Sequence, residues 1–271
     1  MFENQGGQMI ENINALKGHA TELERLLRMK TYPIAARMLK QEDDIPVGAK
    51  RPKKDLGHHL ALCQAISMAR REGESFALLK EDMWCFYPVI GLGIDAPPQY
   101  FFEGEFLYPR SVRTPEIGHK GVQSFPRLEV GQYIGVAVAP LEKVNFVPDL
   151  FILYVDSLQL VELLMAKRWM DGGDVTATLS GTSACVYTIV PVVNKRQFQV
   201  TIPCLGDRKR GMATDEEIIF SGPSDQLGEL VAGLSHMKEV GSGLPLSMAS
   251  QIEYALPDSY IKIGRMIGMD L

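Results

Sequence analysis

The segment of residues 147–173 reads VPDLFILYVDSLQLVELLMAKRWMDGG, and it predicts a buried strand that leads directly into a helix. The apolar run at its start has the length of a strand. Asp156 and Ser157 follow it, and such residues cap helices because their side chains accept hydrogen bonds from free backbone N–H groups. Gly172 then ends the helix, since glycine adopts the left-handed conformation of helix C-termini. The chain therefore combines strands with helices.

Outward from this segment, strands and helices alternate most clearly between residues 131 and 240. This alternation predicts an α/β or α+β fold with a mixed sheet and flanking helices. Residues 104–130 are rich in loops and predict a connection between two subdomains within one family domain, residues 20–103 and 131–240.

Four further segments refine this picture. Residues 8–29 predict an amphipathic helix that Gly18 interrupts, so two short helices remain an alternative. Residues 31–39 predict a strand that begins at Pro33 or lies at a sheet edge, because proline donates no hydrogen bond. Residues 58–73 predict a helix. Residues 175–193 predict a strand, a turn carrying Cys185 and another apolar run.

Composition limits the classes of function. The chain has 271 residues, a hydrophobic fraction of 46% and a net charge of −5. A nucleic-acid binder needs an excess of cations, so that class is disfavoured. The N-terminus lacks the pattern of a signal peptide, and no stretch approaches the ~20 apolar residues of a membrane span. We expect a cytoplasmic protein that does not enter membranes. Homo-oligomer formation is left open.

The cysteines are the main candidates for chemistry. Cys63, Cys85, Cys185 and Cys204 are dispersed without a C-x-x-C motif. In the cytoplasm they are thiols or metal ligands, because structural disulfides rarely persist there. Four thiolates suit zinc or an iron–sulfur cluster. Two alternatives stay open: buried thiols that only pack, which fits Cys63 best, and a nucleophilic Cys204 beside cations.

Two groups of cations and one small-residue turn are candidates for binding an anion. The cations lie at residues 50–54 and 208–210, and Arg208 and Arg210, which follow Cys204, are the candidate contacts of the anion. A phosphate or a coenzyme A tail suits such groups, although charge runs are commonly solvated surface. The turn before Cys185 can present backbone amides to the same anion. Its candidate residues are Ser180, Gly181 and Ser183.

Several motifs together resemble a prokaryotic family of uncharacterised proteins, domain of unknown function one-six-nine. The similar stretches occur in the same order along most of residues 21–235. They are YPIAARML with EDDIPVGAKRP, LCQAISMARREG, WCFYPVIGLG, VAPLEKVNFVPDLFILYVDSLQLVELL, SGTSAC and PCLGDRKRG.

The resemblance implies that the segments of all four cysteines belong to a shared pattern. The family is common in anaerobic bacteria and archaea, which suits oxygen-sensitive chemistry. It therefore favours an iron–sulfur cluster with Cys63, Cys85, Cys185 and Cys204 as ligands over zinc. The cluster is expected to serve redox or Lewis-acid chemistry on a small anionic molecule.

Two competing classes remain. One is a metal-free ligand-binding or accessory protein with buried structural cysteines and a basic anion-binding loop. The other is a hydrolase with Cys204 as nucleophile, for which the sequence offers no general base.

Overall fold

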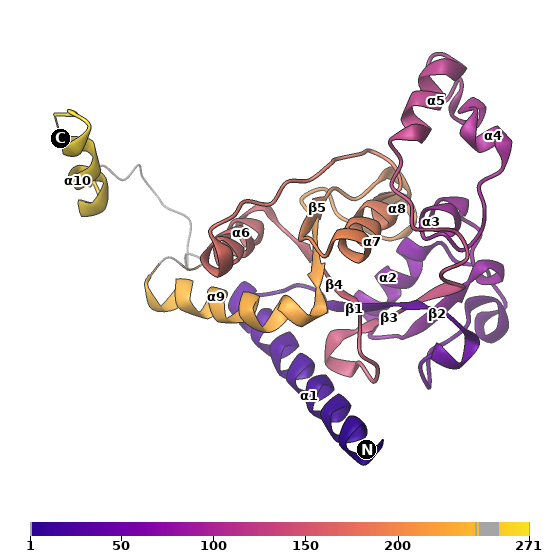
Figure 1. Ribbon diagram of the computed structural model, residues 1–271, viewed down its shortest axis with the longest axis horizontal. Helices are drawn as coiled ribbons and strands as arrows, with labels where there is room; N and C mark the ends of the chain where they lie inside the picture. The colour runs from indigo at the N-terminus through magenta and orange to yellow at the C-terminus, as the bar shows by residue number, and fades with distance from the viewer. Residues whose placement is uncertain (1, 242, 244–254, 271) are drawn as a thin grey trace.

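The computed structural model describes residues 2–241, 243 and 255–270, which form a six-stranded sheet with helices on both faces (Figure 1). The strand order is β2-β3-β1-β4-β6-β5, and every neighbouring pair is antiparallel. The strands are β1 (Ile34–Leu39), β2 (Phe76–Leu79), β3 (Gly135–Pro140), β4 (Leu150–Val155), β5 (Gln199–Thr201) and β6 (Ile218–Pro223). The predicted class of sheet and flanking helices is confirmed, but the named strands are antiparallel throughout and do not form the mixed sheet that was expected.

Strand β1 shows why the sheet is covered on both faces. Successive strand residues point to opposite faces. Ile34, Ala36 and Met38 belong to one core, whereas Ala35 and Leu39 belong to the other, and all five are buried. Apolar residues on both faces require a helical layer on each.

Five longer helices supply these layers. The first core receives α2 (Leu62–Glu72) and α7 (Ala184–Lys195). The second receives α1 (Phe2–Leu27), α6 (Ser157–Asp171) and α9 (Leu227–Glu239). Figure 1 shows α1 and α9 on one side of the strands and α7 on the other.

Shorter elements connect this framework. The helices are α3 (Phe86–Gly91), α4 (Gln99–Phe102), α5 (Pro115–Gln123), α8 (Leu205–Arg210) and α10 (Asp258–Met266). The single turns lie at Glu42–Asp44, Pro52–Leu56, Lys80–Asp82, Glu105–Leu107, Leu141–Lys143 and Ser224–Gln226. Helices α4 and α5 form a lobe that projects from the body beyond α3 (Figure 1).

The strand and helix of residues 147–173 are confirmed. Strand β4 leads into α6, and the Asp156 carboxylate accepts hydrogen bonds from the N–H groups of Leu158 and Gln159 at 3.0 and 2.9 Å. Gly172 ends α6 with a φ of 75°. The strand continues the sheet that β1 begins, since β1 pairs with both β3 and β4.

At two places near the N-terminus the structure decides between alternatives that the sequence left open: the first helix is single, and β1 begins directly after Pro33. Gly18 does not split the first helix, because Leu16, Ala20 and Leu23 on the same helix are buried in the second core and hold it together. Strand β1 is central, not at an edge. Pro33 precedes the strand, where it needs no hydrogen bond of its own, and its carbonyl accepts one from Leu141 at 2.8 Å.

The interpretation of residues 175–193 is also wrong in part. No strand forms at residues 174–183, and Cys185 lies in helix α7 instead of a turn. Most residues of α7 are buried, so packing against the sheet outweighs the strand preference of its β-branched residues. Thr188 also suits the helix, because its hydroxyl donates to the Ala184 carbonyl at 2.8 Å.

Candidate functional site

All four cysteines line one pocket of about 520 Å³, which we call the cysteine pocket. They come from sequence segments that lie far apart: Cys63, Cys85, Cys185 and Cys204. Between Cys63 and Cys204 lies more than half of the chain. Only the tertiary fold therefore brings these thiols to one place. Each cysteine side chain is partly exposed and free of any disulfide.

Each cysteine stands at the N-terminal end of a helix. Cys63 and Cys185 are the second residues of α2 and α7, while Cys85 and Cys204 directly precede α3 and α8. Free backbone N–H groups and the positive end of the helix dipole favour negative charge at such positions. The backbone N–H groups of Gln64 and Tyr87 act in this sense, since they lower the pKa values of Cys63 and Cys85.

Burial nevertheless keeps three of the thiols protonated. It raises the pKa of Cys63 and of Cys185 far above the ordinary thiol range, and it raises the pKa of Cys85. Negative charge on the neighbouring cysteines and on Asp207 adds to the effect on Cys63 and Cys185. The thiols of Cys63, Cys85 and Cys185 are therefore neutral, and a metal that binds thiolates displaces their protons.

Within the described part of the chain, no three His, Cys, Asp or Glu side chains come close enough together to hold a metal ion. Four sulfurs on one zinc ion lie roughly 4 Å apart because each zinc–sulfur bond is ~2.3 Å. An iron–sulfur cluster has several irons and spreads its cysteine sulfurs to about 7 Å. The four cysteines line one pocket, but no three of the described ligand-type side chains are placed as the ligands of a metal ion.

A buried polar network connects two of the helices that position the pocket cysteines, although none of its residues lines the pocket. Asp207 of α8 is 1% exposed, and its Oδ2 accepts a hydrogen bond from the Tyr154 hydroxyl at 2.8 Å. The Arg70 guanidinium lies 4.0 Å from the centre of the Tyr154 ring and forms two hydrogen bonds with Glu217, at 2.6 and 3.0 Å. Because Arg70 belongs to α2, the network ties the helix of Cys63 to the helix that follows Cys204.

Asp207 is the most perturbed carboxylate of this network. Burial raises its pKa to about 6, against the effect of Tyr154 and Arg70. Its Oδ1 has no hydrogen-bond partner among the described residues. The space beside Oδ1 exists because residue 211 is glycine: a Cβ at Gly211 would lie 2.3 Å from this oxygen.

The candidate anion-binding residues divide into two groups. Arg210, Gly181 and Ser183 line the cysteine pocket, and the Arg210 guanidinium lies 4.9 Å from the centre of the Trp84 ring. Arg208 and Ser180 are not among its lining residues. Arg208 donates a hydrogen bond to the Thr214 carbonyl at 2.6 Å, and the Ser180 hydroxyl accepts one from the Thr182 N–H at 3.3 Å.

Two residues of the cation group at residues 50–54 form ion pairs away from the cysteine pocket. Lys50 pairs with Glu74, and Arg51 pairs with Glu81 and Asp82. None of Lys50, Arg51, Lys53 and Lys54 belongs to the lining of the cysteine pocket.

Several lining residues escaped the sequence analysis as site residues. Arg110 arrives from the lobe of α4 and α5, whereas Lys209 of α8 already belonged to the candidate cation group at residues 208–210. Phe106 also belongs to that lobe, while Trp84 and Phe86 flank Cys85. The sequence WCFY around Cys85 contained a usable signal, because aromatic residues on both sides of a thiol are typical of a pocket wall.

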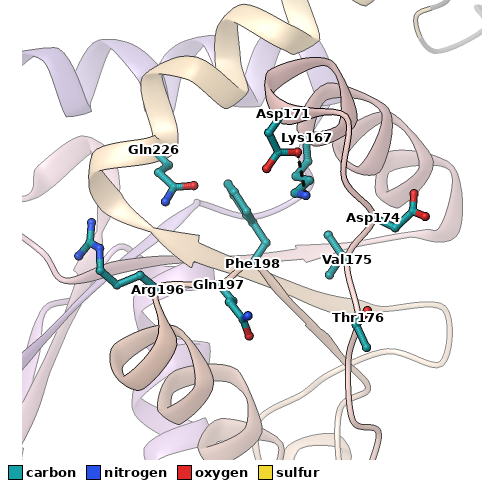
Figure 2. A pocket seen from close by; sticks show the side chains of 9 residues that line it. All are labelled: Lys167, Asp171, Asp174, Val175, Thr176, Arg196, Gln197, Phe198 and Gln226. Atoms are coloured by element: carbon teal, nitrogen blue, oxygen red, sulfur yellow. Dashed lines mark ion pairs between the residues drawn. The ribbon is translucent and has the colours of Figure 1, made fainter.

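A second pocket, of about 330 Å³, lies against the second core, and we call it the paired pocket. Figure 2 shows the ring of Phe198 between Gln226 and Lys167, with Lys167 joined to Asp171. The Lys167 ammonium and the Asp171 carboxylate are 2.9 Å apart. The remaining lining residues are Asp174, Val175, Thr176, Arg196 and Gln197. Arg196 pairs with Asp225, so both cations of this pocket have carboxylate partners.

Comparison with known proteins places the chain in a family. Residues 22–233 match the family of uncharacterised ArCR proteins known as DUF169. The chain belongs to this family. It is also 25% identical over 233 residues to an uncharacterised protein of Methanocaldococcus jannaschii, a match that spans 84% of this chain and 97% of that protein. No solved structure matches it.

The matched region includes all four cysteines and Arg110, Lys209 and Arg210. The cysteine pocket thus lies within the family domain. Among the residues that the structure describes, no helix has the length and apolar character needed to cross a bilayer.

Proposed function

We propose that this protein is a cytoplasmic iron–sulfur protein with Cys63, Cys85, Cys185 and Cys204 as the cluster ligands. The supporting observation is that these four thiols, from four distant segments, line a single pocket. Every cysteine of the chain is there. Thiols that only fill core space have no reason to converge in this way.

The surroundings of the thiols support a cluster more than a zinc ion. The four proposed ligands are all sulfur, which suits an iron–sulfur cluster. A cluster with four thiolates carries net negative charge. The N-termini of α2 and α7, together with Lys209 and Arg210, supply the compensating positive charge.

The ligand set also favours one kind of chemistry. Four cysteines occupy the terminal positions of a cluster and leave no iron open to substrate. We therefore favour one-electron transfer over Lewis-acid catalysis, with a small anionic molecule bound beside the cluster.

The test is anaerobic purification followed by assays for iron, acid-labile sulfide and zinc, together with a visible spectrum. We expect iron and sulfide in similar amounts and a broad visible band. Cys204→Ala should lose both, whereas Ser180→Ala, just outside the pocket, should keep both. A colourless protein that takes up no iron and sulfide on anaerobic reconstitution refutes the cluster, and zinc in their place refutes the choice of metal.

One observation favours a second function, a metal-free ligand-binding protein. The thiols of Cys63, Cys85 and Cys185 are protonated by burial, as expected of cysteines that only pack. Under this function the cysteine pocket binds its anion without metal. Cys204→Ala then leaves anion affinity and colour unchanged.

A further inference from the structure

We propose that the cysteine pocket binds an organic anion with an aromatic ring, its charged group held by Ser183 and the pocket cations and its ring held by Trp84 and Phe86. The inference deepens the function proposed above and rests on it for the chemistry, although binding itself needs no metal. Three independent features of the pocket carry it.

The first feature is an unsatisfied hydroxyl at a helix N-terminus. Ser183 lines the pocket, is 5% exposed, and its Oγ has no hydrogen-bond partner among the described residues. It directly precedes the twelve residues of α7, but its side chain does not cap that helix. Leaving a buried hydroxyl unpaired costs about 1–3 kcal/mol, so a ligand that accepts its hydrogen bond removes a penalty.

The backbone at Ser183 is also strained. Its φ of 57° lies in the left-handed region, which residues with a side chain rarely adopt. This conformation brings the start of α7 to the pocket wall, where the N–H groups of the first turn favour an anion. Strain of this kind is typical of binding sites.

The second feature is positive charge without compensation. Arg110, Lys209 and Arg210 line the pocket, and within the described ranges none of them forms an ion pair with a carboxylate. In the paired pocket, by contrast, both Lys167 and Arg196 have carboxylate partners. Three unpaired cations around one cavity select a ligand with a carboxylate or phosphate group.

The third feature is an aromatic wall. Trp84 and Phe86 line the pocket and are 47% and 45% exposed, which is unusual for such large rings. Phe86 is held in place by Tyr87, at 4.5 Å between stacked ring centres, and by Phe106, at 5.5 Å edge to face. A planar ligand ring gains contact area on this wall at little cost in side-chain entropy.

The size of the pocket agrees with such a ligand. Pockets for small organic molecules commonly enclose about 300–1,000 Å³. The cysteine pocket encloses about 520 Å³, so it is large enough for a single-ring anion.

Tryptophan fluorescence provides the test, because the chain has two tryptophans and Trp84 lies in the pocket. Trp169 stacks on His236 away from it, so Trp169→Phe leaves Trp84 as the sole reporter. The probes are benzoate, phenyl phosphate, benzyl alcohol and inorganic phosphate. We expect saturable quenching by the two aromatic anions and at least about tenfold weaker binding of the uncharged alcohol and the ringless phosphate. The stronger of the two aromatic anions identifies the charged group as carboxylate or phosphate.

Variants locate the bound group. Arg210→Gln and Ser183→Ala should each weaken binding by about fivefold or more. The control is Arg208→Gln, which removes the same charge from the same helix outside the pocket and should bind as before. The inference is overturned if no probe quenches saturably, if benzyl alcohol binds as well as benzoate, or if Arg208→Gln matches Arg210→Gln. Iron assays on the same samples separate the two proposals, since anion binding without iron refutes only the cluster.

Discussion

The cysteine pocket and the paired pocket lie against opposite faces of one sheet, and they hold their charges differently. In the paired pocket Lys167 faces Asp171, whose side chain is 60% exposed, so water solvates much of the pair. On the side of the cysteine pocket, Arg70 of α2 is fully buried and pairs with Glu217. The first arrangement is typical of a solvated surface. The second holds two charged side chains in one geometry, and burying them costs desolvation free energy.

Breaking the buried pair should have the largest effect on stability. Arg70→Met leaves Glu217 buried without its partner, so we expect a loss of about 3–5 kcal/mol in the free energy of unfolding. Urea unfolding of the metal-free protein measures it. Adding Glu217→Leu should restore most of the loss, because the orphaned charge is then gone.

Lys167→Met is the matched change in the paired pocket. Its partner stays solvated, and the expected loss is below about 1 kcal/mol. Equal losses at Arg70 and Lys167 contradict the distinction between the two pockets.

The pH dependence of stability should differ in sign between the pockets. The raised pKa of Asp207, about 6 against an ordinary 3.8, means that the folded protein binds this proton more tightly than the unfolded chain. Its contribution is fully present below pH 3.8 and disappears as the pH rises through about 6. The shift corresponds to about 3 kcal/mol. The stability of the wild type relative to Asp207→Asn should therefore fall by that amount between about pH 3 and pH 7.

Asp171 provides the opposite case. The Gly173 N–H and then Lys167 lower its pKa, so its contribution is present above its ordinary pKa and lost as the pH falls. In acid the wild type should therefore lose a small amount of stability that the Asp171→Asn variant does not lose. Urea unfolding across this pH range checks both variants. The prediction fails if the stability of the wild type relative to each variant changes with pH in the same direction.

A smaller effect tests the close packing around Asp207. A Cβ at Gly211 would lie 2.3 Å from Asp207 Oδ1 and 3.0 Å from the Cys63 carbonyl oxygen. Gly211→Ala should cost about 1–3 kcal/mol, as overpacking does, and should lower iron content. Gly181, at the rim, has nothing within 4 Å of such a Cβ, so Gly181→Ala should change neither. Thermal unfolding and iron assays on both variants show whether the packing around Gly211 is closer than the packing around Gly181.

Local sequence patterns predicted the elements of the fold better than their arrangement. The cap at Asp156 and the stop at Gly172 are local signals, and both act as expected. The central place of β1 depends on its pairing with β3 and β4, residues that lie about a hundred positions away. The helix around Thr188 was missed because its apolar residues suit a buried strand equally well, and only tertiary packing decides.

The candidate site shows the same contrast between residue types, which the sequence reveals, and their arrangement, which it does not. Cys63 and Cys204 were recognisable by residue type, but nothing in their spacing predicts that they share a pocket. Arg208 and Arg210 looked equivalent in sequence. In the folded protein only Arg210 lines the pocket, since two positions apart on helix α8 is enough to turn a side chain away. Arg110 could not be predicted as a pocket residue from the sequence, because it comes from the separate lobe of α4 and α5.

The position of β1 between β3 and β4 has a consequence for biosynthesis. The first strand of the sheet waits unpaired on both edges until residues 135–155 have left the ribosome. Cys204 follows later still, so the fourth thiol joins the other three only when most of the chain has been made. Under the proposed function, iron and sulfide can therefore be bound by all four ligands only after residue 204 has been made.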